Sequence, residues 1–416
     1  MKKYVKNLVK KAKEASYKLA RLDSEKKNAI LFQMADYLLE NKEFILEENA
    51  KDVKAAIKNK LQQSFIDRLA LSEKRLREMS DSLKDIAKLP DPVGKIIDQW
   101  QRPNGLRLKK VRTPIGVIFV IFEARPNVTS DCVGLLFKSS NVAILRGGKD
   151  SINSNRAIGK ILKKAIEASG IDFEPFFIIE KTEHKIVDLL LCENEYIDLV
   201  IPRGGEALIR KVVESSKIPV IKHYKGVCHI FVDKEYDMGK AVRICVNAKV
   251  QRPSVCNAVE KILVHENIAN TLLPLLKNEL DKYKVEIRGD SKACRILKGI
   301  KKAKDADWFA EYLDLIVTIK VVKNIDEAIS HINFYGSHHT DSIVTKNSGN
   351  ATKFTREVDS ACCFVNISTR FSDGFQFGLG AEIGISTDKI HARGPMGLTE
   401  LTTYKWVVEG DGQVRE

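Results

Sequence analysis

The chain has 416 residues, of which 44% are hydrophobic and 30% are charged. This composition is typical of a soluble globular protein of about two to four domains, and it excludes a disordered chain or a small disulfide scaffold. The 69 lysines and arginines exceed the 55 aspartates and glutamates, and the net charge of +14 favours an anionic partner: nucleic acid, an anionic membrane or a phosphorylated metabolite. Because Lys-rich stretches are usually solvated helix faces, charge alone does not choose among these.

The cysteines and the N-terminus indicate where the protein resides. The eight cysteines form no CxxC pair and no disulfide or zinc spacing, so we expect reduced thiols. Residues 1–16 are basic but lack the apolar core of a signal peptide, and no uncharged apolar run reaches the roughly 18 residues that span a bilayer. We therefore expect a soluble, cytoplasmic protein.

The N-terminal quarter is predicted to be helical. Residues 1–89 carry apolar side chains at helical spacing, and this pattern ends at the Pro-containing segment 90–94. Residues 106–112 then predict a short, charged strand that fits a projecting hairpin.

From residue 116 onward, apolar β-rich runs alternate with helical stretches. Strands are predicted at 116–122, 142–145, 176–179 and 197–201, with helices between and after them. This alternation is typical of βαβ units and predicts a nucleotide-binding α/β domain with a parallel sheet.

A second α/β segment is predicted after a domain change. Residues 218–233 have the pattern of consecutive strands, and a helix at 241–250 begins the new segment. A strand at 315–322 and a helix at 325–332 precede a Gly-rich region at 374–397. No internal repeat or low-complexity linker interrupts the chain.

Two predicted strands end in Arg-Gly-Gly, at 146–148 and 203–205, and a helix follows each. Glycine allows a ligand to approach the backbone, helix N-terminal amides attract anions, and arginine adds bidentate hydrogen bonds. A phosphate group suits both loops, although a single loop of this kind is also an ordinary tight turn. Neither is GxGxxG, so the Rossmann fingerprint is absent.

Cys256 has the most distinctive surroundings of any cysteine, in a polar, Pro-containing turn at 251–258. The neighbouring Arg252 favours thiolate formation and attracts an anionic substrate. The alternative for any single cysteine is a buried, inert thiol. That interpretation applies to the cysteines in apolar runs and to the adjacent pair near the C-terminus: Cys132, Cys228, Cys245, Cys362 and Cys363.

The histidines show no metal-ligand spacing. They lack a second set of ligands at helical or hairpin distance, so we expect hydrogen-bonding roles, leave a general base open and predict no metal site. The residues concerned are His223, His229, His338, His339 and His391. The residue patterns together favour an enzyme with a phosphate-bearing cofactor and a cysteine nucleophile.

Longer motifs, each different from the others, are distributed along essentially the whole chain. They lie at 116–118, 123–129, 144–148, 201–205, 251–257, 365–371, 377–384 and 391–397. Together they resemble the gamma-glutamyl phosphate reductase family, also called glutamate-5-semialdehyde dehydrogenases, within the aldehyde dehydrogenase superfamily. Ser254 stands where the family often has glycine, and Cys362 and Cys363 replace smaller residues. None of these changes removes an expected catalytic atom.

The resemblance implies an aldehyde dehydrogenase-like α/β fold with three parts. These are a Rossmann-like NADPH-binding domain over 1–99 and 113–222, an α/β catalytic domain over 223–400, and a small β oligomerisation element over 100–112 and 401–416. The superfamily binds its nicotinamide cofactor without GxGxxG, which accounts for the missing fingerprint.

The same resemblance implies an oxidoreductase of proline biosynthesis. NADPH would reduce L-glutamyl 5-phosphate to L-glutamate 5-semialdehyde with release of phosphate. Cys256 would be the nucleophile that forms a thioacyl enzyme, and Asn127 with the Cys256 amide would stabilise the oxyanion.

Binding roles are carried over by position. Arg146 would contact the 2′-phosphate of NADPH, and Glu311 the nicotinamide ribose. The remaining cofactor contacts fall in the two loops, at Gly147, Gly148, Pro202, Arg203, Gly204 and Gly205. The substrate would meet Ser368, Thr369 and Arg370 at its distal end, and Arg252 or Arg125 at its phosphate. Each of these three arginines has a structural ion pair as its alternative.

Three rival functions remain: a phosphate-independent, hydrolytic semialdehyde dehydrogenase, a basic nucleic-acid-binding protein, and an inactive relative. No water-activating carboxylate is found near the nucleotide loops, and no nucleic-acid-binding module is found. By resemblance we expect a homodimer or homotetramer and a separate glutamate 5-kinase chain as a transient partner, without nucleic acid or membrane.

Overall fold

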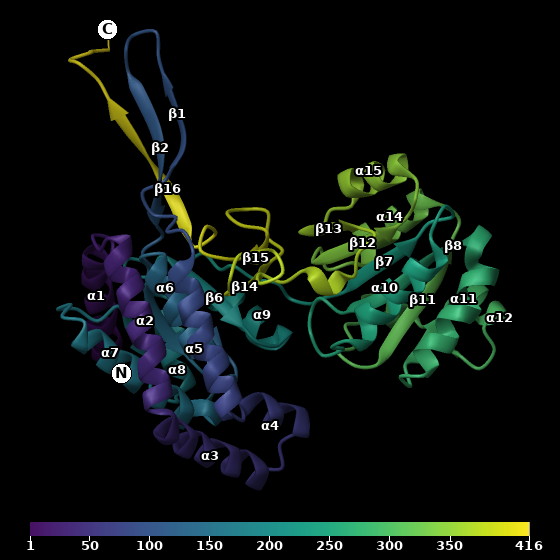
Figure 1. Cartoon of the computed structure of the whole chain (residues 1–416), viewed down its shortest axis with the longest axis horizontal. Coiled ribbons are helices and arrows are strands. Elements are labelled where there is room, and N and C mark those ends of the chain that lie inside the picture. The colour runs from purple at the N-terminus through teal and green to yellow at the C-terminus, as the bar shows by residue number, and fades with distance from the viewer. Residues whose placement is uncertain (416) are drawn as a thin grey trace. The chain divides into compact units, whose positions relative to one another are not determined.

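The computed structural model describes residues 1–415, apart from the side chain of Ser64. Its residue contacts divide the chain into two compact units (Figure 1). The first unit contains 1–222, 378–384 and 396–416, and the second contains 223–377 and 385–395.

Helices form the N-terminal part of the first unit, as the apolar spacing predicts. They are α1 (Lys2–Leu19), α2 (Ser24–Glu40), α3 (Lys42–Lys58), α4 (Gln63–Leu69) and α5 (Glu73–Lys88). The side chain of Asp23 accepts a hydrogen bond from the Lys26 amide and caps α2, and Ser72 caps α5 in the same way. The apolar face of each long helix is buried, and the predicted break at 90–94 follows the end of α5.

A four-stranded parallel sheet forms the centre of the first unit, in the order β5 (Phe176–Ile178), β4 (Val142–Arg146), β3 (Val117–Phe122) and β6 (Leu199–Arg203). The connecting helices are α6 (Asn127–Lys138), α7 (Ile152–Ala168) with the short η1 (Lys149–Ser151), and α8 (His184–Leu190); α9 (Glu206–Ser215) follows β6. The predicted βαβ alternation is therefore confirmed. The chain leaves β3 toward β4 and returns to β6 on the other side of β3. In open α/β sheets, ligands bind at the carboxyl ends of the strands at such a switch point.

The second unit contains a seven-stranded parallel sheet. Its order is β10 (Lys301–Lys302), β9 (Glu286–Gly289), β11 (Ile316–Val322), β8 (Val259–His265), β7 (Cys228–Val232), β12 (Thr340–Val344) and β13 (Cys362–Val365). Helices lie against it: α10 (Met238–Val250), α11 (Glu266–Asp281), α12 (Ser291–Ile296), α13 (Asp305–Phe309), α14 (Ile325–Tyr335), α15 (Ser348–Glu357) and the short η2 (Thr369–Phe371) (Figure 1). Buried aliphatic side chains of the central strands form its core on both faces.

The prediction of consecutive strands over 218–233 is wrong in its first half. Only β7 is a strand, and residues before it make a single isolated bridge between Val200 and Val220. The segment leaves the first sheet at this bridge and enters the second at Cys228, so its apolar residues serve two cores and no continuous strand forms.

The predicted charged hairpin is part of a third sheet that includes residues from the end of the chain. Strands β1 (Ile96–Gln101), β2 (Arg107–Pro114) and β16 (Thr402–Glu409) pair antiparallel in that order. Trp100 and Trp406 meet edge to face across it, with ring centroids 5.3 Å apart, and both stay largely exposed. Two short strands, β14 (Gly384–Ser386) and β15 (Gly394–Met396), pair separately.

The predicted catalytic domain, 223–400, differs from the second unit at two segments. Residues 378–384 and 396–400 group with the first unit. A Cβ at Gly380 would touch Leu89, and the Leu401 carbonyl accepts a hydrogen bond from Asn141, so these returning segments pack within the first unit.

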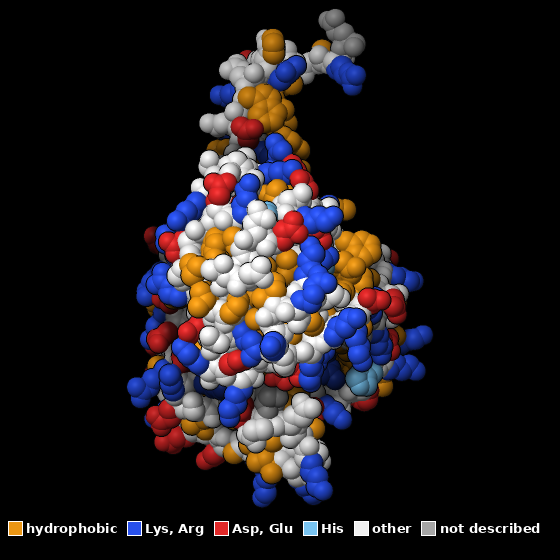
Figure 2. Space-filling model, turned by 90° about the vertical axis from the view of Figure 1, so that its right-hand side faces the viewer, with side chains coloured by type: hydrophobic (Ala, Val, Ile, Leu, Met, Phe, Trp, Pro, Cys, Tyr) orange, Lys and Arg blue, Asp and Glu red, His pale blue; other side chains and the backbone are white. Residues whose placement is uncertain are grey.

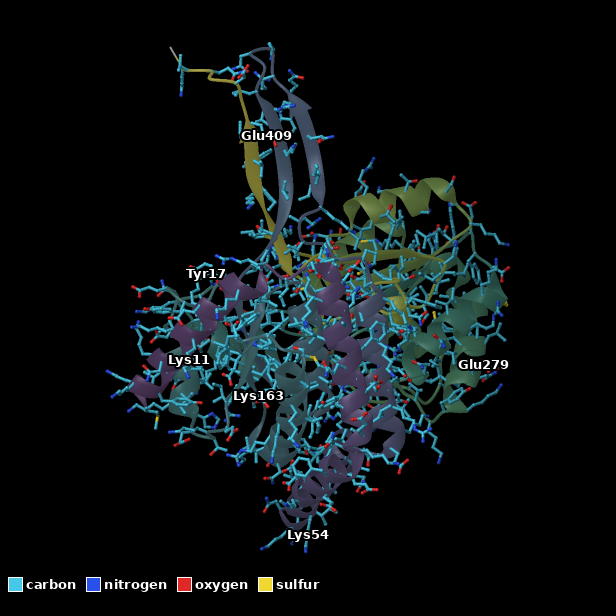
Figure 3. The ribbon with its side chains drawn as sticks, turned by 60° about the vertical axis from the view of Figure 1, so that its left-hand side comes forward. Lys11, Tyr17, Lys54, Lys163, Glu279 and Glu409 are labelled. Atoms are coloured by element: carbon cyan, nitrogen blue, oxygen red, sulfur yellow. The ribbon has the colours of Figure 1, made fainter. Side chains whose placement is uncertain are left out.

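The basic residues are dispersed. In Figure 3, Lys11 and Lys163 lie at the outside of the first unit, and Lys163 pairs with Glu174 at 3.1 Å. On the face in Figure 2, basic side chains are interspersed with acidic and uncharged ones. Among the described residues, no helix is long and apolar enough to cross a membrane.

Candidate active site

The amino ends of three neighbouring strands bring the candidate nucleophile together with two histidines. His223 lies before β7, Cys256 before β8 and His339 directly before β12. Strands β8, β7 and β12 are adjacent, and their pairing begins at Cys228 with Val259 and at Asp341 with His229. Parallel strands in this register present their preceding loops at one edge of the sheet, so residues 116 positions apart become neighbours.

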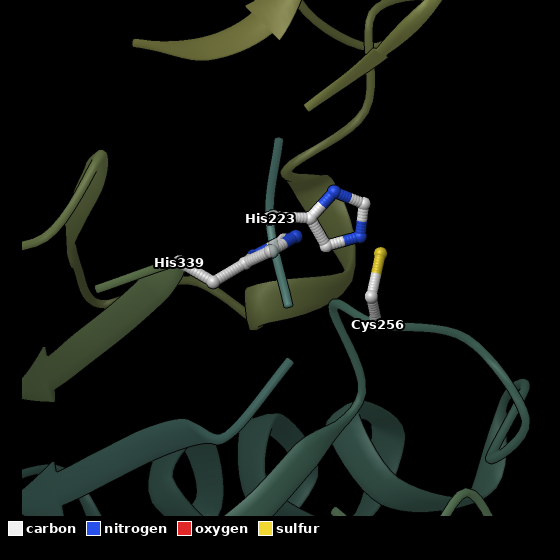
Figure 4. A group of neighbouring side chains, drawn as sticks. All are labelled: His223, Cys256 and His339. Carbon is white, nitrogen blue, oxygen red and sulfur yellow. The ribbon is translucent and has the colours of Figure 1, made fainter. Parts of the chain in front are cut away.

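The three side chains converge on a small space. One ligand atom from each of His223, Cys256 and His339 lies within 4.8 Å of the others, and the two imidazole centroids are 5.7 Å apart. Figure 4 shows a ring nitrogen of His223 beside the Cys256 sulfur. Cys256 and His223 are half-buried, whereas His339 is fully buried. A partly exposed thiol among polar groups is typical of a reactive cysteine.

The Cys256 backbone is held by Gly226 and Cys228. A Cβ built on Gly226 would lie 1.9 Å from the Cys256 carbonyl oxygen, so only glycine fits this approach. The Gly226 amide donates to the Glu311 carboxylate at 2.9 Å, and the Cys228 thiol donates to the Cys256 carbonyl at 3.2 Å. Gly226 thus contacts both the Glu311 carboxylate and the backbone of Cys256.

Arg370, in η2, connects the cysteine loop to the segment after β13. Its Nε donates to the Gln251 side chain at 2.8 Å, and its guanidinium also donates to the Asn257 side-chain oxygen. Asn257 in turn donates to the Ser372 carbonyl at 2.8 Å. Burial, with the neighbouring Arg252 as the second cause, lowers the pKa of Arg370. The site therefore holds concentrated positive charge beside Cys256.

A hollow of about 810 Å³ lies next to this loop. Lys240 and Arg243 of α10 line it together with Ser368 and Arg370. Ser368 is buried and its Oγ accepts a hydrogen bond from the Arg370 amide at 3.3 Å, and Thr369 is fully buried. Ser368 and Thr369 therefore fix the loop, whereas the cationic side chains are the groups suited to an anionic ligand.

In the first unit, both Arg-Gly-Gly loops lie at the carboxyl ends of strands, as predicted. A Cβ on Gly147 would meet the Asn155 amide at 2.1 Å, and one on Gly148 would meet the Ala124 backbone nitrogen at 3.2 Å. Glu123, directly after β3, is joined to the loop after β6, because its carboxylate accepts a hydrogen bond from the Gly205 amide at 2.9 Å. This acceptor occupies the amide at the start of α9 that an anion would use.

The two loop arginines differ in exposure. Arg146 is buried, and its guanidinium donates to the carbonyls of Gly147 and Thr182. Burial lowers the pKa of Arg146. The nearby Glu183 carboxylate has the opposite, smaller effect. Arg203 is half-buried, and its guanidinium lies 2.7 Å from where a Cβ on Gly384 would be.

Asn127 and Arg125 lie at the start of α6, in the first unit. Both are exposed, and the Asn127 side chain donates to Asp131 at 3.1 Å. Burial raises the pKa of Asp131 to about 6, although hydrogen bonds from Asn127 and Ser82 lower it. Arg252, beside the cysteine in the second unit, is also exposed.

The structure groups Cys256, Arg252, Ser368, Thr369, Arg370 and Glu311 in the second unit, and the other candidates lie in the first. The sequence predicted only hydrogen-bonding roles for His223 and His339, with a general base left open, and it assigned no role to Gly226 or Glu123. The histidines were isolated in sequence, and only the strand register joins them. Of the thiols expected to be buried, Cys132, Cys228, Cys245 and Cys362 are buried and Cys363 is half-buried. Burial raises the pKa of Cys132 and Cys245 to about 12.

Comparison with known proteins shows to which family the chain belongs. A model of the aldehyde dehydrogenase family matches residues 1–314. The chain belongs to the aldehyde dehydrogenase family. Within this family it groups with the gamma-glutamyl phosphate reductases. The protein of that name from Thermodesulfovibrio yellowstonii is 53% identical over 416 residues, 100% of both chains. The one from Caldanaerobacter subterraneus is 54% identical over 98% of each.

Solved structures agree with this grouping. The crystal structure of gamma-glutamyl phosphate reductase from Thermotoga maritima has a TM-score of 0.97 and 48% identity, covering 99% of this chain and 100% of that one. An acetylating aldehyde dehydrogenase from Geobacillus thermoglucosidasius, at 16% identity and a TM-score of 0.70, shares the fold over 100% of this chain and 98% of its own. The expected aldehyde dehydrogenase-like fold is thus confirmed, and with it a domain of the kind that binds a nicotinamide cofactor.

Proposed function

We propose that this chain catalyses the reductive dephosphorylation of L-glutamyl 5-phosphate to L-glutamate 5-semialdehyde in proline biosynthesis. The supporting observation is a half-buried cysteine held beside Arg252 and Arg370, in a chain about half identical over its whole length to gamma-glutamyl phosphate reductases. An acyl phosphate carries both an electrophilic carbon for the thiolate and negative charge for the arginines.

Cys256 supplies the covalent step. Its thiolate attacks the acyl carbon, the C–O bond to phosphate breaks, and inorganic phosphate leaves with the bonding electrons, giving a thioacyl enzyme. When bound, the reduced nicotinamide supplies the hydride that this thioester carbonyl accepts. Breaking of the C–S bond then releases the aldehyde and regenerates the Cys256 thiolate. The Cys256 amide and Asn127 are the proposed oxyanion donors in both halves.

The cationic groups are proposed to bind the ends of the substrate. Arg370 would pair with the glutamyl α-carboxylate at the edge of the hollow, where Ser368 and Thr369 hold its loop. Arg252 or Arg125 would receive the leaving phosphate, and both are exposed side chains. Because Arg370 already bridges Gln251 and Asn257, substrate binding uses an arginine whose position is fixed beforehand.

The cofactor is proposed to be NADPH, bound at the carboxyl edge of the first sheet. The glycines at 147, 148, 204 and 205 suit it, because a Cβ at Gly147, Gly148 or Gly204 would meet neighbouring atoms. Pro202 and Arg203 would flank the pyrophosphate, which replaces the Glu123 carboxylate at the Gly205 amide. Arg146 would reach the 2′-phosphate after exchanging its carbonyl partners, and Glu311 would bind the nicotinamide ribose.

The three-stranded sheet is proposed to join subunits into a dimer or tetramer. Its outer strands β1 and β16 expose Ile97, Trp100, Trp406 and Val408, and exposed edges recruit further strands. A separate kinase chain would supply the unstable acyl phosphate through a transient contact.

The test is the reverse reaction. Pyrroline-5-carboxylate, the cyclised semialdehyde, is incubated with NADP⁺ in the presence and absence of inorganic phosphate, for the wild type and Cys256→Ser. Absorbance of the reduced nicotinamide should rise only with phosphate and only in the wild type. Turnover without phosphate would establish the hydrolytic alternative instead, and equal turnover by Cys256→Ser would exclude the thioacyl route.

A further inference from the structure

We propose that His223, Cys256 and His339 form a reversible Zn²⁺ site, and that the bound ion blocks the nucleophile. One thiolate and two imidazoles are the ligands that Zn²⁺ prefers, and sites with three protein ligands keep a fourth position for water. The three ligand atoms lie within 4.8 Å of one another. Tetrahedral zinc places such atoms about 3 to 4 Å apart, so a small rotation of the half-buried side chains closes the site.

The His223 ring is oriented for this role. Its Nδ1 lies 3.0 Å from the Ile385 carbonyl and donates its proton there, because a carbonyl oxygen can only accept. Nε2 then carries the lone pair, and Figure 4 shows the ring turned with a nitrogen beside the Cys256 sulfur. A backbone carbonyl that holds the second ring nitrogen is the usual support of a zinc-bound histidine.

A hydrogen-bond chain fixes the His339 tautomer as well. The Ser372 hydroxyl donates to the Cys362 sulfur at 3.4 Å, and the Thr340 hydroxyl donates to Ser372 at 2.8 Å. Thr340 has therefore used its only proton, and its oxygen accepts from His339 Nδ1 at 2.9 Å. Nε2 of His339 is again the acceptor nitrogen, so both imidazoles offer the same ring atom.

The chemistry of these atoms selects the cation. Sulfur and imidazole nitrogen are poor ligands for Mg²⁺ and Ca²⁺, which bind oxygen, and good ligands for Zn²⁺. Burial of His339 and the fixed loop at Gly226 reduce the ordering that binding requires. The inference does not depend on the proposed reaction, because any chemistry that needs a free Cys256 thiolate would stop while zinc is bound.

The test measures zinc affinity of the metal-free, full chain with a chromophoric chelator as competitor. We expect one Zn²⁺ per chain in the wild type, and a loss of at least tenfold in affinity for Cys256→Ser and for His223→Asn. Cys192→Ser is the matched control, because this exposed cysteine lies in the first unit, and its affinity should equal that of the wild type. Co²⁺ in place of Zn²⁺ should give a thiolate charge-transfer band that Cys256→Ser abolishes.

A second measurement detects zinc at Cys256 through the reactivity of its thiol and does not depend on catalysis. Zn²⁺ should slow alkylation of Cys256 by iodoacetamide, followed by peptide mass spectrometry, and a chelator should restore the rate. Thermal melts check that each variant is folded, and His223→Asn is decisive because His339 is buried and its replacement can unfold the chain. Unchanged zinc affinity in folded His223→Asn would overturn the proposal, as would equal affinity in Cys256→Ser. A change in the metal-free alkylation rate alone would assign the histidines to the thiol proton instead.

Discussion

Gly226 shows how closely the backbone is packed around Cys256. A Cβ built on Gly226 would lie 1.9 Å from the Cys256 carbonyl oxygen and 2.6 Å from the Cys256 Cα. The Gly226 amide donates a hydrogen bond to the Glu311 carboxylate. Any side chain here must push the cysteine loop outward. A displacement of about 1 Å at a reacting group can cost about 100-fold in rate.

We therefore expect Gly226→Ala to lower turnover about 100-fold and to destabilise the fold by about 1 to 3 kcal/mol through overpacking. Steady-state rates and urea unfolding measure the two effects. Gly239→Ala is the matched control, because the new Cβ would lie 3.6 Å from Asp237 in ordinary contact, and it should leave both values unchanged. A Gly226→Ala enzyme with wild-type turnover would refute the close-approach argument.

Residue-level sequence reasoning identified Cys256 and Arg370 from local motifs and resemblance, and the structure brings these two together. It named His223 and His339 but did not predict that they approach Cys256, because this approach depends on the register of β7, β8 and β12. It assigned Arg146 to the 2′-phosphate of NADPH but did not predict that this side chain is buried and donates to backbone carbonyls. Side-chain direction at a strand end is set by tertiary packing, which a single sequence does not encode locally.

At the level of elements, α6 carries a half-buried carboxylate, that of Asp131, near its start. Asp131 accepts hydrogen bonds from Asn127 and Ser82, yet burial raises its pKa from 3.8 to about 6. Between pH 4 and 6 the folded chain therefore binds a proton that the unfolded chain has released. The contribution of Asp131 to stability falls as pH rises through this range, and the cost of burying its charge is complete above it.

Asp131→Asn should remove this pH dependence. We expect the variant to be more stable than the wild type at pH 7 by on the order of 1 kcal/mol, and the difference to vanish near pH 4. Urea midpoints at a series of pH values measure it, with Asp81→Asn, an exposed carboxyl of α5, as the control. A difference that stays constant between pH 4 and 7 would contradict the raised pKa.

Element boundaries were predictable where the periodicity was strong. Strands β3, β4 and β6 follow from continuous apolar runs, and all three are buried on both faces. Gly116 precedes the first run, and an Arg-Gly-Gly sequence ends each of the other two. Residues 218–227 also include apolar side chains, but they form no strand because these side chains belong to two cores. Burial of a run therefore predicts a strand only when one sheet provides the contacts.

At the scale of the molecule, the three-stranded sheet is the structural feature best suited to join subunits. Trp406 is 49% exposed on the edge strand β16, and it packs edge to face on Trp100. Large exposed aromatic side chains on an unpaired edge are typical of interfaces. The proposed dimer or tetramer should depend on them.

We expect Trp406→Ser to lower the molecular mass measured by sedimentation toward that of a single chain at micromolar concentration. Tyr17→Ser is the control, because Tyr17 is an exposed aromatic side chain of α1 in the same unit (Figure 3), and its variant should sediment like the wild type. Circular dichroism checks that the fold is kept. An unchanged mass for Trp406→Ser would move the interface elsewhere.

The pairing of β2 with β16 joins residues about 300 positions apart, Arg107 with Glu409 among them. On the ribosome, β2 emerges long before its partner strand β16. The second unit draws its sheet and its cysteine from the continuous stretch 223–377, so it can fold while the earlier unit is still incomplete. The second unit can thus form the loop that carries Cys256 before β16 completes the sheet through which subunits are proposed to meet.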